Sequence, residues 1–192
     1  MQSFLTTKFF ERSATKVAPD LLGKFLVRRL RGKKIALMIT EVEAYHGFKD
    51  RASHASKGLT QRNKIMFGEA GNWYVYFIYG MYWMLNIVTG DKSMPSAVLI
   101  RGVKEFNGPG KLTKTLRINK YFNGKTANKK TGLWIEDRGV KIGNPPSRKA
   151  SEGNFRFLKT KIKKGPRIGV DYAGPVWSKK QWRFYLEGAS HT

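Results

Sequence analysis

The stretch WYVYFIYGMYWMLNIV, residues 73–88, contains no charged residue and places two apolar segments on either side of Gly80. Aromatic and β-branched residues around a glycine-containing turn are typical of a β-hairpin, so we predict strands at 73–79 and 83–88. The stretch is too short for a membrane-spanning helix, and Gly80 and Asn86 interrupt it. It is therefore interpreted as the central hairpin of a sheet.

Further predicted elements lie on both sides of this hairpin. Residues 46–64 form a long basic loop, and we find no repeat and no interdomain linker. We therefore expect residues 1–192 to form a single compact α+β domain, with a mainly antiparallel curved sheet, flanking helices and a protruding aromatic β-hairpin. The further predicted elements are helices at 14–22 and 111–118 and strands at 25–30, 35–45, 97–103, 132–136, 155–158, 167–170 and 183–186.

The charge of the chain is strongly unbalanced. Lys and Arg number 37 and Asp and Glu 13, which gives a net charge of +24 at pH 7. A small domain with this charge repels itself, and a polyanion would relieve the repulsion. Nucleic acid is the leading partner, an anionic membrane surface is the alternative, and charge for solubility alone is the third interpretation.

The composition also limits the cofactors that we expect. The chain has no cysteine, and its histidines, His46, His54 and His191, are too few and too scattered for a zinc site of normal spacing. We therefore expect no metal and no cofactor. The first thirteen residues do not resemble a signal peptide, so the chain is predicted to be a cytoplasmic, intracellular protein, associated with the nucleoid if it is prokaryotic.

Two carboxylates stand out because acidic residues are scarce. Alternation along a strand would place Leu37, Ile39, Glu41, Glu43 and Tyr45 on one face. Carboxylates on an apolar face are costly unless they are paired or used. In the purely structural interpretation, both carboxylates pair with basic neighbours on an exposed sheet face. In the functional interpretation a general base lines a pocket beside Tyr45.

The hairpin turn is unusually apolar, because Tyr79, Met81 and Tyr82 surround it. Aromatic residues in a hairpin are often simply core. In a protein this basic, however, the turn is also typical of a wedge that enters a base stack.

Asn86 and His54 are weaker signals. A strand asparagine usually satisfies local hydrogen bonds, although its amide could also contact a base edge. A loop histidine such as His54 is usually solvated.

Taken in order, these segments resemble the alkyladenine (3-methyladenine) DNA glycosylase family. The resemblance covers most of the chain outside roughly residues 121–165, and it depends on the whole ordered set of motifs. These motifs are EVEAY at 41–45, ASHA at 52–55, TQRNKIMF at 60–67, YVYFIYGMY at 74–82 with Asn86, AVLIR at 97–101, GPGKL at 108–112, INK at 118–120, RIGV at 167–170 and RFYL at 183–186.

The resemblance implies a role for each site residue. Glu43 would activate water, and Arg101 with the backbone of Ile168 would hold that water. The base-stacking and base-reading residues would be Tyr45, His54 and Tyr76, with Asn86 guarding against guanine. Tyr79 would fill the gap left by a flipped nucleotide, and the further residues expected to contact DNA are Met81, Tyr82, Thr60, Arg62 and Lys111.

The sequence departs from the family pattern in places. Ile168 and Leu186 stand where valine is frequent, and the loop after His54 is slightly shortened. The fine shape of the pocket depends on these positions.

The function that the resemblance implies is excision of damaged purines from double-stranded DNA by a monomer. A paired base hides its glycosidic bond, so the enzyme must extrude the base before a carboxylate-activated water can attack. Two alternatives stay open at this stage. A lysine nucleophile would make the enzyme a glycosylase/lyase. A basic RNA- or ribosome-binding module would use the hairpin as a stacking platform, without releasing a base.

Overall fold

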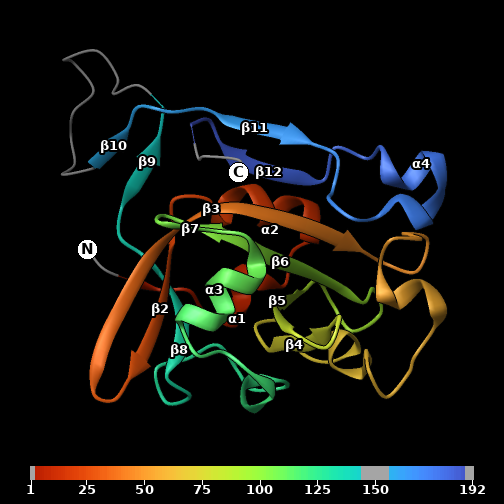
Figure 1. The fold of residues 1–192 in the computed structure, drawn as a ribbon, viewed down its shortest axis with the longest axis horizontal. Coiled ribbons are helices and arrows are strands. Elements are labelled where there is room, and N and C mark those ends of the chain that lie inside the picture. The colour runs from red at the N-terminus through yellow and green to blue at the C-terminus, as the bar shows by residue number, and fades with distance from the viewer. Residues whose placement is uncertain (1–2, 144–155, 189–192) are drawn as a thin grey trace.

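The computed structural model describes residues 3–143 and 156–188. Within these residues, ten strands form one sheet with the order β1-β8-β2-β3-β6-β5-β4, to which β7, β11 and β12 are added at β6 and β3 (Figure 1). All of its pairs are antiparallel. The strands of this sheet are β1 Ser3–Phe4, β2 Phe25–Leu30, β3 Lys33–His46, β4 Trp73–Ile78, β5 Tyr82–Thr89, β6 Ser96–Val103, β7 Phe106–Asn107, β8 Leu133–Asp137, β11 Ile162–Gly165 and β12 Arg183–Leu186.

The predicted α+β class with a mainly antiparallel sheet is confirmed. A separate parallel pair consists of β9 Val140–Ile142 and β10 Arg156–Leu158. The prediction of a strand at 155–158 agrees with β10, although residue 155 lies outside the described residues.

The helices are short and connect the strands. In the described residues, none of them has both the length and the apolar character needed to span a bilayer. The predicted helix at 14–22 is α2, and the one at 111–118 is α3, which starts earlier because Pro109 occupies its first turn. The helices are α1 Thr7–Phe10, α2 Ala14–Leu21, α3 Pro109–Thr115 and α4 Gly174–Ser178, with 3-10 turns at η1 His54–Lys57, η2 Lys64–Phe67, η3 Lys120–Phe122 and η5 Asp171–Ala173.

The hairpin predicted from residues 73–88 is present as β4 and β5. Trp73 and Val75 point into the main core, and Tyr74 belongs to a second cluster against which Tyr76 packs. The strand alternation therefore gives β4 two functions: one face holds the sheet together and the other supplies tyrosines to a cavity.

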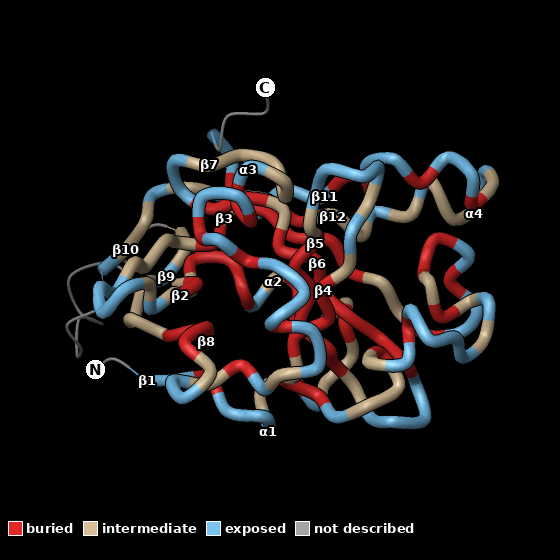
Figure 2. Tube along the Cα trace, turned by 60° about the horizontal axis from the view of Figure 1, so that its bottom comes forward, coloured by how far each residue is buried: buried red, intermediate tan, exposed pale blue. Residues whose placement is uncertain are grey.

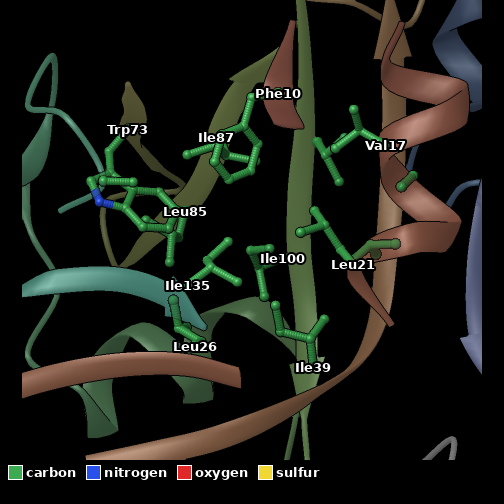
Figure 3. Packing of buried hydrophobic residues seen from close by; sticks show 14 of the residues in the cluster. Phe10, Val17, Leu21, Leu26, Ile39, Trp73, Leu85, Ile87, Ile100 and Ile135 are labelled. Carbon is green, nitrogen blue, oxygen red and sulfur yellow. The ribbon is translucent and has the colours of Figure 1, made fainter. Parts of the chain in front are cut away.

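The main core fills the space between the sheet and the helices. Figure 3 shows Val17 and Leu21 of α2 facing Ile39 and Ile100, with Trp73 at the far side of the cluster. In Figure 2 the buried residues concentrate in the central strands, whereas α4 consists of exposed and intermediate residues. The site described below lies at this less buried end of the molecule.

A bulge in β3 changes the predicted sidedness of that strand. The register against β6 shifts between Ile39 and Glu41 and again between Glu41 and Val42. As a result Ile39 and Val42 both belong to the core, and Glu43 lines a cavity. The prediction that Leu37 and Ile39 share a face with Glu43 is therefore wrong, because a bulge inserts a residue and reverses the alternation beyond it.

The predicted strand at 167–170 is also wrong. The nearby strand is β11, which ends at Gly165, and the chain then turns through Gly169 with a φ of 72°. The backbone N–H of Ile168 donates to the carboxylate of Glu43 and not to a neighbouring strand. An apolar alternating tetrapeptide is too short to distinguish a strand from a turn that serves a side chain.

Candidate active site

The site begins with Glu43, which the β3 bulge directs away from the main core. Its side chain is fully buried, and its two oxygens accept separate hydrogen bonds. Oε1 accepts from the N–H of Ile168 at 2.8 Å, and Oε2 accepts from the hydroxyl of Tyr45 at 2.8 Å. The Nε atom of Arg101 lies 3.5 Å from Oε1. These contacts fix the orientation of the carboxylate.

Burial raises the pKa of Glu43 above its ordinary value, and Arg101 and the two hydrogen bonds oppose part of this effect. A carboxylate with a raised pKa is a stronger base than an exposed glutamate. The site therefore provides a general base that is held in one orientation.

Glu41 has a different environment from Glu43, although only one residue separates them. It is also buried, but it forms ion pairs with Arg101 at 3.1 Å and with Arg183 at 3.3 Å. The interpretation that both carboxylates pair on an exposed face is wrong, because neither is exposed. Glu41 is held mainly by two arginines, whereas Glu43 is held mainly by hydrogen bonds from Tyr45 and Ile168.

The predicted residues meet around one hollow region. An outer cavity of about 630 Å³ is lined by Glu43 and Arg101 of the sheet and by Ile168 of the turn. An inner cavity of about 40 Å³ is lined by Asn86 and also by Tyr172, which borders both. The residues predicted for catalysis and base recognition therefore lie together, and those that line both cavities include Tyr45, His54 and Tyr76.

An aromatic wall forms one side of the inner cavity. The ring centroids of His54 and Tyr76 lie 4.7 Å apart, and those of Tyr74 and Tyr76 lie 5.0 Å apart. His54 Nδ1 forms a hydrogen bond with the Tyr74 hydroxyl at 2.9 Å. Burial, together with the nearby Arg62 and Lys57, lowers the pKa of His54 to about 4, so its ring is neutral at pH 7. His54 therefore adds a neutral ring to the wall.

Asn86 is buried on β5 beside this wall. Its Nδ2 donates to the carbonyl oxygens of Tyr74 at 3.1 Å and Met84 at 3.4 Å. The interpretation that its amide satisfies the hairpin is thus confirmed. The same bonds fix the orientation of the amide at the cavity, so the structural role does not exclude a recognition role.

The hairpin turn is exposed at the mouth of the outer cavity. Tyr79 lines that cavity, is 81% exposed and has a φ of 51°, a left-handed conformation that is strained for a tyrosine. Met81 and Tyr82 are also exposed. The turn therefore presents exposed side chains, two of them tyrosines, to the solvent.

The other residues predicted to contact DNA are exposed but separated. Arg62 lies over the ring of Tyr76 and donates to the carbonyl of Phe77, and Lys111 lies on α3. Thr60 caps the turn that contains Asn63, with hydrogen bonds in both directions. The structure brings Arg62 and Tyr79 to the outer cavity, whereas Lys111 and Thr60 are not among its lining residues.

Sequence reasoning missed several residues of this region, among them Tyr74, Asp50 and Arg167. The position of Tyr74 two residues before Tyr76 on a strand is a signal that could have placed it on the same face. Asp50 and Arg167 form a buried ion pair across 117 residues of sequence, and no local pattern indicates such a pair.

Comparison with known proteins identifies the family to which the chain is similar. The family model for methylpurine-DNA glycosylase matches residues 8–107 and 104–190. A relative from Methanocella arvoryzae, provisionally named a 3-methyladenine DNA glycosylase, is 41% identical over 94% of this chain and 91% of its own length. Relatives with the same name from Legionella pneumophila (strain Paris; 41% identical, 95% of this chain and 94% of the relative) and Myxococcus xanthus (36%, 98% and 93%) agree.

These similarities place the chain among the DNA glycosylases, a class of DNA-repair enzymes. Within this class it belongs to the methylpurine-DNA glycosylase family. The resemblance inferred from the sequence motifs is thereby confirmed.

Proposed function

We propose that the protein is a monofunctional glycosylase that acts as a monomer on double-stranded DNA containing damaged purines. Its substrates would be alkylated or deaminated purines of the 3-methyladenine, 7-methylguanine, hypoxanthine and etheno-adenine class. The observation that carries the proposal is the buried carboxylate of Glu43, which lines the same cavity as the rings of Tyr45, His54 and Tyr76. A flipped base needs stacking surfaces and a base catalyst within reach of its sugar.

In this proposal Glu43 removes a proton from water as the water oxygen attacks C1′. The C1′–N bond breaks, and its electron pair leaves with the purine. A cationic alkylated purine departs without a proton, whereas a neutral purine such as hypoxanthine must also accept one. Arg101 and the backbone of Ile168 flank the carboxylate, which supports their role in holding the water.

Recognition of the base would come from the two cavities. Tyr45 and Tyr76 offer ring faces, and these stack on any purine without selecting one. Asn86, with its amide held by backbone carbonyls, would oppose the 2-amino group of guanine. Tyr79, with Met81 and Tyr82, would occupy the space in the duplex that the extruded nucleotide leaves.

Two other functions would use the same cavity differently. A glycosylase/lyase would use a lysine nucleophile, and Lys57 lines the outer cavity. An RNA-binding module would bind without base release. Incubation with alkylated DNA, followed by chromatography of the free bases, tests the proposal directly. We expect methylated purines to be released, and borohydride to trap no protein–DNA adduct. Binding without release, or a trapped adduct, would reject monofunctional hydrolysis.

A further inference from the structure

Arg167 is a fully buried cation to which the proposed chemistry gives no role. Its side chain and that of its partner, Asp50, both have 0% exposure. The pairing is bidentate: Nη1 lies 2.6 Å from Oδ2 and Nη2 lies 2.8 Å from Oδ1. Burying two charges carries a large desolvation cost, so a buried ion pair is weak evidence for a purely stabilising role.

Two of the remaining contacts of Arg167 lead to the site, whereas the others join it to the Trp177 carbonyl at 3.3 Å and to the Trp182 ring, whose centroid is 5.1 Å away. Nη1 also donates to the carbonyl of Ala44 at 2.9 Å, and Ala44 is the residue between Glu43 and Tyr45. The guanidinium carbon lies 4.8 Å from the centroid of the Tyr45 ring. One side chain therefore holds both the backbone between the two site residues and the ring that borders the cavity.

The arginine also sets the position of its neighbour in the chain. The next residue, Ile168, donates its backbone N–H to Oε1 of Glu43. Meanwhile Asp50 accepts from the N–H groups of His46 at 3.2 Å and Ala52 at 3.1 Å, at the start of the loop that carries His54. The ion pair thus connects β3, this loop and the 167–170 turn.

The three nitrogens of Arg167 differ in their hydrogen bonding. Its buried Nε finds no hydrogen-bond partner among the residues that the structure describes. An unsatisfied buried donor is costly and calls for an explanation. The two Nη atoms are held by Asp50, Ala44 and the Trp177 carbonyl, and the guanidinium lies near the rings of both Tyr45 and Trp182.

We propose that Arg167, clamped by Asp50, is a positioning residue that holds the Tyr45 ring and the Ile168 N–H in place against Glu43. This inference rests on the proposed function, in which Glu43 is the base. A lysine at position 167 would keep the charge but could not form the bidentate pair with Asp50, and it would loosen the 167–170 turn. The N–H would then leave Glu43, and Tyr45 would lose the group that supports one of its faces.

This role has a consequence that a purely structural role lacks. The charged and titratable groups that face Glu43 are Arg101, Tyr45, Glu41, Tyr76 and Tyr172, and the Ile168 N–H is a further contact that lowers the pKa of Glu43. Loss of that N–H raises the pKa further. The acid limb of the pH–rate profile should then move to higher pH, whereas a change in the folded fraction alone would scale the rate and leave the limb in place.

The experiment compares Arg167→Lys, Asp50→Asn and the double variant in single-turnover excision of hypoxanthine across pH. Far-UV circular dichroism establishes that each is folded at the assay temperature. We expect each single variant to lose about 10²-fold in rate, with the acid limb displaced upward. The double variant should be no worse than the poorer single one, because the two residues act as a unit.

The matched control is Arg12→Lys, which alters an ion pair with Asp20 on the surface and should leave the rate and pH profile unchanged. Asp50→Asn keeps the size of the side chain and an acceptor for Ala52, so it tests the idea if Arg167→Lys does not fold.

Wild-type rates, or an unmoved acid limb, in folded variants would overturn the positioning role. Glu43→Gln is assayed in parallel to separate the two proposals. An active Glu43→Gln rejects the proposed function itself. An inactive Glu43→Gln with wild-type behaviour at Arg167 and Asp50 rejects only this inference.

Discussion

We define the floor of the two cavities as Glu43 of the outer cavity, Asn86 of the inner cavity and Tyr45, which lines both. These side chains are hydrogen-bonded in single orientations. At the rim, defined as Tyr79, Met81 and Tyr82, they are exposed, and Tyr79 is held in a left-handed turn. The floor is preorganised inside the protein, as expected for groups that must act at a fixed distance. In the proposed function the exposed rim residues contact DNA. The two regions should therefore respond differently to substitution.

The largest effect is expected at the floor. Glu43→Gln should lower single-turnover excision of hypoxanthine by about 10²–10⁴-fold, because the amide cannot accept a proton from water. DNA binding, measured by fluorescence anisotropy, should be retained. Glu41→Gln is the matched control, since Glu41 is buried in the same strand and paired with Arg101 and Arg183. The excision rate of Glu41→Gln should fall much less than that of Glu43→Gln. Comparable losses in both variants would mean that the two carboxylates act only as an electrostatic group.

The rim should matter most when the lesion is hard to extrude. Tyr79→Ser should slow excision of a stably paired lesion by about tenfold or more, because the stacking of the ring against the duplex is lost. When the same lesion is mispaired, the variant's excision rate should fall less, since the base is already easier to extrude. The rates on both duplexes are compared for each protein. Equal losses would assign Tyr79 to the fold and remove the contrast with the floor.

Asn86 should change selectivity more than rate. In Asn86→Ser the shorter side chain no longer opposes a 2-amino group, so release of normal guanine should rise by a few-fold to about tenfold. Release of 3-methyladenine should remain largely intact. Chromatography of bases released from undamaged and methylated DNA measures both. Because Nδ2 of Asn86 also bonds two backbone carbonyls, the melting temperature is recorded as a control. If guanine exclusion is unchanged, Asn86 has only its structural role.

Charges outside the cavity should affect binding alone. Lys111→Gln should reduce the slope of log K against log[salt] by about 0.9, the contribution of one phosphate contact. Excision by the saturated enzyme should not change. Lys33→Gln, at the first residue of β3, is the matched control and should leave the slope as it is. An unaltered slope in Lys111→Gln would remove this residue from the DNA surface.

The smallest effect concerns stability, and it has the opposite sign to the effect on activity. Burial raises the pKa of Glu43 in the folded state, so the unfolded chain ionises at lower pH. Between the two pKa values the folded state binds more protons, and stability therefore falls as the pH rises through this window. Glu43→Gln has no buried charge at this position, so it should be more stable than the wild type at pH 7. Its melting temperature should be higher by about 2–4 °C for each kcal/mol gained in the free energy of unfolding. The difference should vanish in acid. A lower melting temperature in Glu43→Gln at pH 7 would contradict the raised pKa.

Much of the fold could be predicted from periodicity. The 73–88 hairpin, the long strand that carries Glu43 and the strand that carries Arg101 appear where apolar alternation indicates them. Alternation also indicated that Glu43 and Tyr45 share a face, and their direct hydrogen bond agrees. These features depend on neighbours within one strand, and the sequence displays such neighbours directly.

The motifs of the sequence thus determined the family, the strands of the hairpin and several of the residues that line the cavities. Only the tertiary structure decided how those residues are held. The bulge that turns Glu43 away from the face of Ile39, the turn that brings the Ile168 N–H to it and the Arg167–Asp50 pair all depend on contacts between distant segments. Such contacts leave no periodic trace, because a bulge, a turn and a buried ion pair each need a partner that only the folded chain brings near.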